Sequence, residues 1–297
     1  MDDAGALLRA FEARRARLQA VAYRMLGSLP EAEDAVQETW LRLCRPGVGP
    51  VDNLDAWLTT VVARVCLNVL RARRRRGEEP FGVHLPDPVV TADDGGQPEE
   101  QAVLADSVGL ALLIVLETLS PPERIAFVLH DVFGVPFGAI APIVERSEAA
   151  ARQLASRARR RVRGAEIASA EADRTRQRQV VDAFFAAAQG RSLEALMAVL
   201  DPEVVLRSDA GDWRPQFTMV VRGVEEVARW AVPLPNSELL PVRVNGAAGV
   251  LVLLAGQPFS IMAFTVRLGR ITEIVGIADP ARVRRLSSAV LDVRRQR

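Results

Sequence analysis

The sequence has 297 residues, about twice the length of a typical domain, so two or three domains are expected. It is 49% hydrophobic and 25% charged, and its 38 basic residues, all of them arginine, nearly balance 37 acids. Two cysteines and two histidines are too few for a disulfide framework or for the usual four-ligand zinc site within one chain. We therefore expect no metal and no cofactor.

Neither a secretory signal nor a membrane span is expected. The first residues, Met1–Ala4, are acidic and no apolar stretch follows them. The most apolar stretch, Val108–Leu116, is far shorter than the roughly 20 residues that span a bilayer. The sequence therefore predicts a cytoplasmic protein that does not contact a membrane.

Apolar residues recur at helical spacing through the first quarter of the chain, which predicts three helices. These helices are expected over 7–26, 31–43 and 54–73, with a glycine- and proline-rich loop at 46–50. The third helix should turn a valine-rich face inward, formed by Leu58, Val61, Val62, Val65 and Val69. It runs into five arginines within 71–76.

The composition then inverts, because the segment from Gly77 to Asp106 contains eight acids and no arginine. Prolines and glycines are spread through it, so it predicts an extended or disordered linker. We hypothesise that its acids cover the arginines at 73–76 in the idle protein. A helix is expected next over 103–119, followed by another with Ser120 as its N-cap and Pro121 at its first position.

Residues 131–163 give the most specific signal in the chain. Two helices, over 137–144 and 147–163, are expected with the short turn Glu145-Arg146-Ser147 between them. The second helix should bury Ala151, Leu154, Ala158 and Val162 and expose arginines and Gln153. Such side chains contact phosphates and read bases, and the layout is typical of a helix-turn-helix in the DNA major groove. An ordinary solvated helical hairpin is the alternative.

Two further helix faces can be interpreted either as binding surfaces or as ordinary solvated helix surfaces. One face of the third helix combines an aromatic side chain with polar ones, namely Trp57, Thr60, Arg64, Asn68 and Arg71. This combination suits single-stranded nucleic acid, but it also fits a solvated basic face. The second helix has an acidic face that either is solvated or docks a basic partner helix; it includes Asp34, Gln37 and Glu38.

After about Asp173 the pattern changes to short helices, expected over 180–188 and 193–200, and then to strands. Strands are expected over 204–206, 216–222, 242–245, 250–255, 261–268 and 271–277. Turns are expected at Arg222-Gly223, Asn245-Gly246 and Leu268-Gly269-Arg270. The sequence therefore predicts an all-α front half and an α+β back half.

The front half resembles the bacterial sigma-70 family, in its extracytoplasmic-function type. The resemblance rests on AYRMLGSLPEAEDAVQETWLRL, LDAWLTTVVARVCLNVLRARRRR and LSPPERIAFVLHDVFGVPFGAIAPIVERSEAAARQLASRARRRVR, which are similar to regions 2.1–2.2, 2.3–2.4 and 4. It implies a factor, not an enzyme, that binds core RNA polymerase and directs promoter-specific initiation. One departure is Glu145, which stands where a turn glycine is usual.

The same resemblance implies a role for each surface. The β′ clamp helices of polymerase would contact Asp34, Gln37 and Glu38, and the β flap would contact region 4. The −10 element would be read by Trp57, Thr60, Arg64, Asn68 and Arg71. The −35 element would be bound by Arg146, Ser147, Arg152, Gln153, Ser156, Arg157 and Arg160, with Arg159–Arg163 on phosphates.

Residues of about 174–285 resemble the SnoaL-like cone fold, and the whole arrangement is similar to the sigma-J-like subgroup. In that subgroup the extra domain regulates in cis, which implies contact between the SnoaL-like domain and the sigma domains. The segment FGVHLPDPV is similar to the subgroup's linker motif. A regulatory loop is implied at the subgroup's remaining signatures, formed by Asp209, Gly211, Asp212, Asp279 and Pro280.

A cone fold implies a cavity, for which four interpretations stay open: a relic, a site for the linker peptide, a small-molecule sensor, or a catalytic pocket with Asp209 or Asp212 as general base. A stand-alone repressor with a ligand-binding cone, or a SnoaL-like isomerase or cyclase with a DNA-binding appendage, would also account for parts of the sequence.

We predict a multidomain protein with a sigma region 2 helical bundle (1–76), an acidic linker (77–105), a sigma region 4 helix-turn-helix (106–168) and an α+β SnoaL-like domain (174–290).

Overall fold

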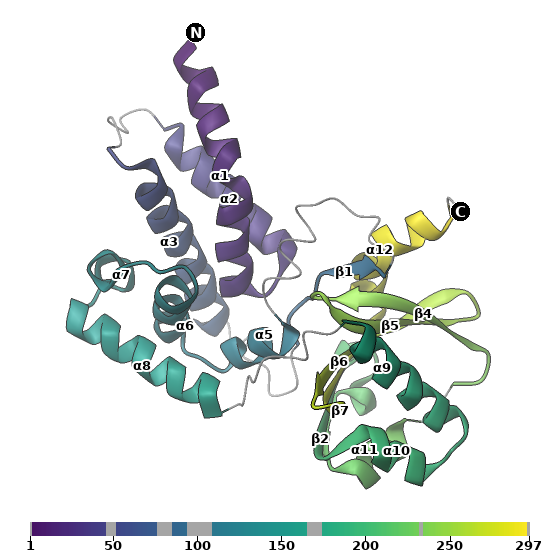
Figure 1. The fold of residues 1–297 in the computed structure, drawn as a ribbon. Coiled ribbons are helices and arrows are strands. Elements are labelled where there is room, and N and C mark those ends of the chain that lie inside the picture. Colours follow the sequence, from purple (N-terminus) through teal and green to yellow (C-terminus); the bar gives the residue numbers. More distant parts are fainter. Residues whose placement is uncertain are drawn as a thin grey trace. The chain divides into compact units, whose positions relative to one another are not determined.

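The computed structural model describes residues 2–45, 52–75, 85–93, 109–164, 174–231 and 234–295 (Figure 1). The chain forms two compact units. One consists of Met1–Glu79 with Leu112–Glu166, and the other of Pro80–Ala111 with Ile167–Arg297. Within the described ranges no helix has both the length and the apolar character needed to cross a bilayer.

The first unit begins with three packed helices, α1 (Asp2–Leu26), α2 (Leu29–Leu43) and α3 (Leu54–Arg75). Their shared core is fully buried, with Phe11, Leu18, Val21, Met25, Leu26, Val36, Leu58 and Val62 each at most 2% exposed. The three predicted helices are confirmed, and the predicted loop at 46–50 lies outside the described residues.

The buried face of α3 differs from the expected one. Val61 and Val69 are only half-buried, whereas Ala63, Cys66 and Leu67 are at most 2% exposed. The physical reason is that α3 packs against α1 and α2 on one side and against the later helices α6 and α7 on the other. The buried face of α3 is therefore centred on other residues than the valines from which it was predicted.

The unit continues with α5 (Leu110–Glu117), α6 (Pro121–Phe127), the π-helical turn η1 (Val128–Val132), α7 (Phe137–Val144) and α8 (Glu148–Gly164). Ser120 is the N-cap of α6 and Pro121 is its first residue, as predicted. The Glu123 carboxylate accepts hydrogen bonds from the Ser120 amide at 3.2 Å and from its hydroxyl at 2.6 Å. Of the helix expected over 103–119, the part before 109 lies outside the described residues.

The second unit is built on one seven-stranded sheet with the order β1-β4-β5-β6-β7-β2-β3, in which only the β2–β7 pair is parallel. The strands are β1 (Val90–Ala92), β2 (Leu200–Asp209), β3 (Met219–Arg222), β4 (Ser237–Val244), β5 (Ala247–Leu254), β6 (Gln257–Arg267) and β7 (Arg270–Ile277). The helices are α9 (Arg174–Gln189), α10 (Leu193–Val199), α11 (Val224–Trp230) and α12 (Pro280–Arg295). Short 3-10 turns cover Gly211–Trp213 and Pro215–Phe217.

Helices α9, α10, α11 and α12 pack against the sheet (Figure 1). Side chains of α9, α10 and α11 form a core with one face of the sheet, where they meet Leu206, Val250 and Phe264. Helix α12 packs against β6 and against β1. Because successive strand residues point to opposite faces, the side chains on the two faces of β2 and of β6 contact different elements.

The six predicted strands are confirmed as elements, with one correction. Gln216 and Phe217 belong to a 3-10 turn rather than to a strand. The turns Asn245-Gly246 and Leu268-Gly269 both have two successive positive φ angles, which the right-handed twist of a tight hairpin favours. Strand β1 was not predicted as a strand, because it comes from the acidic linker and pairs with β4.

Candidate promoter surfaces and a linker clamp

Helix α8 exposes the side chains predicted to bind the −35 element. Ala151, Leu154 and Ala158 are buried as expected, while Val162 is half-buried. The Ser147 hydroxyl accepts from the Ala150 amide at 3.2 Å and so caps the helix start. All seven predicted −35 residues are exposed: Arg146, Ser147, Arg152, Gln153, Ser156, Arg157 and Arg160.

Some of the exposed arginines of α8 have an ion-pair partner and others have none among the described residues. Arg152 pairs with Glu148 at 2.9 Å, and Arg157 lies 3.7 Å from Glu123. Gln153, Ser156 and Arg160 have no side-chain partner in the described part of the chain, and their 153–156–160 spacing puts them on one helical face. This face is the one most available to base edges.

Glu123 is the acid that connects α6 with α8. It is 5% exposed and accepts a charged hydrogen bond from Arg161 at 3.1 Å. Burial alone would raise the pKa of Glu123, but the hydrogen bonds from Ser120 together with the charges of Arg161 and Arg157 outweigh it, so its pKa lies below the ordinary value. Glu123 is therefore ionised and fixes how α6 and α8 pack.

The predicted −10 residues are distributed along α3. Arg64 and Asn68 are exposed, whereas Trp57, Thr60 and Arg71 are half-buried. The Thr60 hydroxyl donates to the Ala56 carbonyl at 2.8 Å, so it satisfies its own helix. The predicted loop at 46–50, which precedes Trp57, lies outside the described residues.

The −10 face of α3 is in contact with the helix-turn-helix. Arg64 donates to the Pro142 carbonyl of α7 at 3.4 Å, and Arg71 pairs with Glu145 of the turn at 3.2 Å. Nearby, Arg124 of α6 is buried and donates to the Met25 carbonyl of α1 at 3.0 Å. Two surfaces predicted to contact different promoter elements therefore pack together here.

The predicted polymerase contacts lie on the outer side of α2. Asp34 and Gln37 are exposed and have no partner among the described residues. Glu38 is half-buried and pairs with Arg42 at 2.8 Å. An acidic strip of this kind remains available to a basic helix, and Arg42 would compete for Glu38.

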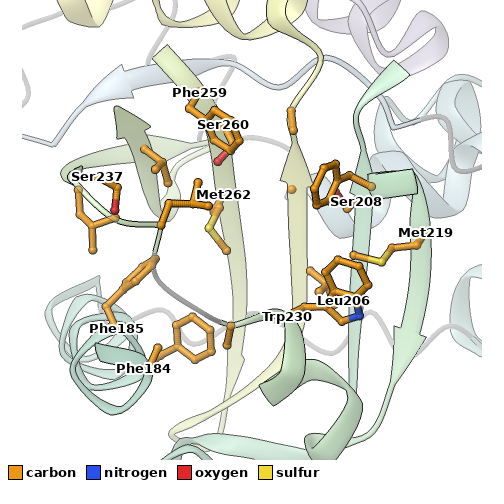
Figure 2. Close-up of a pocket in the computed structure, with 18 of the residues that line it drawn as sticks. Phe184, Phe185, Leu206, Ser208, Met219, Trp230, Ser237, Phe259, Ser260 and Met262 are labelled. Carbon is orange, nitrogen blue, oxygen red and sulfur yellow. The ribbon is translucent and has the colours of Figure 1, made fainter. Parts of the chain in front are cut away.

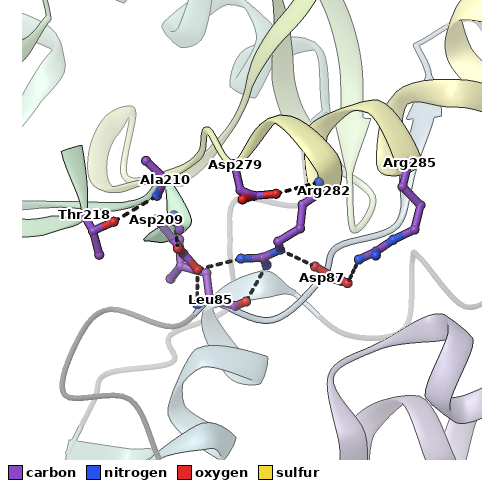
Figure 3. Close-up of polar contacts among 9 residues, drawn as sticks. Leu85, Asp87, Asp209, Ala210, Thr218, Asp279, Arg282 and Arg285 are labelled. Carbon is purple, nitrogen blue, oxygen red and sulfur yellow. Dashed lines mark hydrogen bonds and ion pairs between the residues drawn. The ribbon is translucent and has the colours of Figure 1, made fainter. Parts of the chain in front are cut away.

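Asp209, one of the predicted regulatory-loop residues, meets the linker at a charged cluster, which we call the linker clamp (Figure 3). It consists of Asp209, Arg282 and Arg285 around Leu85 and Asp87 of the linker. The Asp209 carboxylate accepts from the Leu85 amide at 3.0 Å and from Arg282 at 2.6 Å. Arg282 also donates to the Leu85 carbonyl at 2.6 Å and pairs with Asp87 at 2.8 Å, and Arg285 pairs with Asp87 as well.

The neighbouring residues hold the clamp in shape. Asp279 accepts from the Arg282 amide at 2.8 Å and begins α12, with Pro280 as its first helical residue. Gly211 has a φ of 61°, and a Cβ there would lie 2.6 Å from the Asp279 carboxylate, so glycine is required. Asp212 is exposed and has no partner in the described chain.

A second set of contacts fixes the linker beyond the clamp. The Val89 amide donates to the Asn245 side chain at 2.7 Å, and the Asn245 amide returns a bond to the Val89 carbonyl at 2.9 Å. Asp93 lies 3.4 Å from Arg178 and from Arg243. The described linker acids, Asp87 and Asp93, thus have arginines of the second unit among their partners, and the hypothesis that the linker acids cover Arg73–Arg76 stays a prediction.

The sequence singled out Asp209, with a general base as one of the roles left open. Its carboxylate is 4% exposed and is committed to the Leu85 amide, the Gly211 amide and Arg282. Arg282, Arg285 and Asn245 were missed. The N-cap and proline of Asp279-Pro280 signal a helix start that would have placed Arg282 and Arg285 on one face, three residues apart.

Comparison with known proteins first defines the class. The helical unit matches the family model of Sigma-70 region 2 over residues 10–76 and that of Sigma-70, region 4 over residues 110–162. Helices α1–α3 fall within or next to the first match, and α5–α8 span the second. The helical unit is therefore that of a sigma-70-type transcription initiation factor.

More particularly, the chain belongs to the extracytoplasmic-function (ECF) sigma factors of RNA polymerase. It is 38% identical to ECF RNA polymerase sigma factor SigJ of Mycobacterium tuberculosis over 91% of each chain. It is also 36% identical to the probable ECF sigma factor SigI of the same species, over 92% of this chain and 93% of the relative. The crystal structure of SigJ matches with a TM-score of 0.74 and 36% identity, covering 93% of this chain and 97% of that chain.

These findings confirm the predicted family and fold class, including the SnoaL-like C-terminal domain. They favour a transcription initiation factor over the repressor and the isomerase that the sequence also allowed. The individual contact residues on α2, α3 and α8 stay predictions.

Proposed function

We propose that this sigma factor reads the −35 element with α8 and the −10 element with α3, and that its C-terminal domain modulates initiation in cis by holding the linker between them. The exposed side chains of Gln153, Ser156 and Arg160 support the first part. Core polymerase would bind the acidic strip of α2 and separate α3 from α7. Arg64 and Arg71 then become available to single-stranded DNA.

The observation that carries the cis role is the linker clamp. Residues 77–105 connect the two promoter-binding regions, and the clamp ties Leu85 and Asp87 in the middle of that connection to the C-terminal domain. A tethered chain reaches only about 3.3–3.6 Å per free residue, so fixing its centre limits how far the two regions can separate. In this proposal promoter binding requires that separation, and the clamp therefore restrains promoter binding.

Run-off transcription with core polymerase and the full-length protein tests this proposal. Arg282→Ala removes the side chain that holds both Asp87 and Asp209, and we expect it to raise run-off yield at least about twofold because about 0.4 kcal/mol already gives that change. Arg284→Ala, an exposed arginine on the same helix without a partner in the described chain, is the matched control and should resemble the wild type. Thermal unfolding of both variants checks that the domain stays folded.

The outcomes separate the two parts of the proposal. If the wild-type protein starts no RNA chain with core polymerase at any promoter tested, the sigma-factor role is contradicted. If transcription occurs but Arg282→Ala gives the yield of Arg284→Ala or less, the restraint by the clamp is contradicted. A truncation after residue 168, which removes the whole C-terminal domain, should reproduce the increase seen with Arg282→Ala.

A further inference from the structure

The C-terminal domain contains a partly open cavity of about 230 Å³ between the sheet and helices α9 and α11 (Figure 2). Strands β2, β3, β4 and β6 contribute to its wall. The clamp lies elsewhere, because no described linker residue lines the cavity. The cavity is therefore a separate feature with no occupant from residues 85–93.

Most of the cavity wall is aromatic or aliphatic. Five aromatic side chains line it, namely Phe184, Phe185, Phe217, Trp230 and Phe259. A dry apolar cavity of about 150 Å³ takes up benzene, so one of about 230 Å³ has room for a body of roughly two fused rings. Flat aromatic walls favour a flat apolar ligand.

Three hydroxyl groups interrupt this apolar wall, those of Ser208, Ser237 and Ser260 (Figure 2). None of them has a hydrogen-bond partner among the residues that the structure describes. Polar groups inside a folded domain are normally hydrogen-bonded, so these hydroxyls are available to a molecule in the cavity. They favour a molecule that carries polar atoms besides its apolar body.

Arg214 supplies the one charge among the described residues of the lining. Its guanidinium lies 4.6 Å from the centroid of the Phe259 ring, which holds it against the wall. In the described chain no carboxylate pairs with Arg214. A half-buried guanidinium without an anion favours a ligand with a carboxylate, which it binds with two parallel hydrogen bonds.

Catalysis does not fit the same wall. The described lining contains no aspartate, glutamate, histidine or cysteine that could act as a base or nucleophile. Asp209 follows Ser208 on β2, and because neighbouring strand residues point to opposite faces, its carboxylate faces the clamp instead. The chemistry of this wall is that of a binding site.

We propose that this cavity binds a small amphipathic carboxylate with an apolar body of about two fused rings, whose carboxylate contacts Arg214 and whose rings lie among Phe184, Phe259 and Trp230. The inference concerns binding alone and stands whether or not the linker clamp restrains initiation.

Isothermal titration of the full-length protein with 2-naphthoate and with its neutral analogue 2-naphthamide tests the proposal. We expect 2-naphthoate to bind one site, and Arg214→Ala to weaken it about tenfold or more while changing 2-naphthamide affinity less than about twofold. Arg222→Ala removes an exposed arginine of β3 outside the lining and is the matched control, for which both affinities should equal those of the wild type.

Filling the cavity gives an independent readout. Ser260→Phe, or Ser208→Leu if the former does not fold by circular dichroism, should abolish binding of both probes. The proposal is overturned if 2-naphthoate does not bind the wild type, if Arg214→Ala weakens it no more than Arg222→Ala does, or if the filled variant binds as well as the wild type. Transcription plays no part in these measurements, so their failure leaves the proposed function untouched.

Discussion

Glu145 shows how a single residue can strain the helix-turn-helix. It ends α7 with φ 57° and ψ 46°, the left-handed conformation that glycine adopts without steric cost. For other L-residues this conformation costs about 1–2 kcal/mol. Its ion pair with Arg71 lies at the surface, with the Glu145 side chain 67% exposed and that of Arg71 35% exposed, and surface pairs contribute only about 0–1 kcal/mol, so the pair offsets the strain in part.

We expect Glu145→Gly to stabilise the helical unit by about 0.5–1 kcal/mol, because the relief of backbone strain exceeds the loss of the ion pair. Urea unfolding should show the midpoint moving to higher concentration. Glu145→Ala is the matched control, since it removes the ion pair but keeps the Cβ, and its midpoint should equal or lie slightly below that of the wild type. A midpoint for Glu145→Gly no higher than that of Glu145→Ala would contradict the argument.

Residue identities in the back half show where sequence reasoning reached its limit. Asp209 and Asp279 could be picked out because the resemblance to the sigma-J-like subgroup places that subgroup's signatures at these positions. The partner of Asp209 could not, since Leu85 lies 124 positions away and binds through its backbone amide, which carries no sequence signature. Arg282 was one arginine among many, and only the fold shows that it faces Asp87 and Asp209.

At the scale of elements, α6 and α8 depend on one buried acid. Glu123 completes the capping box of α6 and holds Arg161 of α8 at 3.1 Å. Its pKa is lowered below the ordinary 4.5 because the hydrogen bonds from Ser120 and the neighbouring arginines outweigh its burial. A lowered folded-state pKa means that ionised Glu123 stabilises the fold above pH 4.5, and that this contribution is lost as the pH falls through the folded-state pKa.

We expect Glu123→Gln to lower the free energy of unfolding by about 1 kcal/mol at pH 7, since glutamine still accepts from Ser120 but has no charge for Arg157 and Arg161. The difference from the wild type should shrink as the pH falls below 4.5 and vanish once the wild-type carboxyl is protonated. Urea unfolding between pH 7 and pH 3 measures it. Glu148→Gln, at an exposed pair, should change stability by only a few tenths of a kcal/mol throughout. A gap that persisted unchanged at pH 3 would contradict the role of ionised Glu123.

The helices of the front half were predictable because their signals are local: apolar spacing, the Ser120 cap and the short turn all lie within a few residues. Strands β4–β7 were also predictable, since alternation and turn glycines mark them. Strand β1 was not, because three residues of an acidic segment form a strand only where β4 offers an unpaired edge and Asn245 binds Val89. Tertiary contacts outweighed the local composition there.

At the scale of the whole chain, the C-terminal domain contributes two features that share one strand. Ser208 of β2 lines the cavity, and the next residue, Asp209, holds the linker at the clamp. Ala278 repeats this arrangement, since it lines the cavity and its amide donates to the Asp209 carbonyl at 2.8 Å. A molecule in the cavity therefore packs against the segments that position the clamp, without touching the linker.

This arrangement predicts that occupancy of the cavity stabilises the clamp, a step that depends on both proposals above. A ligand against Ser208 and Ala278 raises the free energy needed to open the end of β2, so the Leu85 amide, bound to Asp209, should exchange with deuterium more slowly. We expect 2-naphthoate to slow exchange at Leu85 by the same factor as at Ala278, and to leave Arg124 in the helical unit unchanged. Arg214→Ala should remove the slowing at both positions at the same ligand concentration. If 2-naphthoate binds and protects Ala278 while Leu85 exchanges as before, the cavity and the clamp are independent, and a ligand there could not influence initiation through the linker.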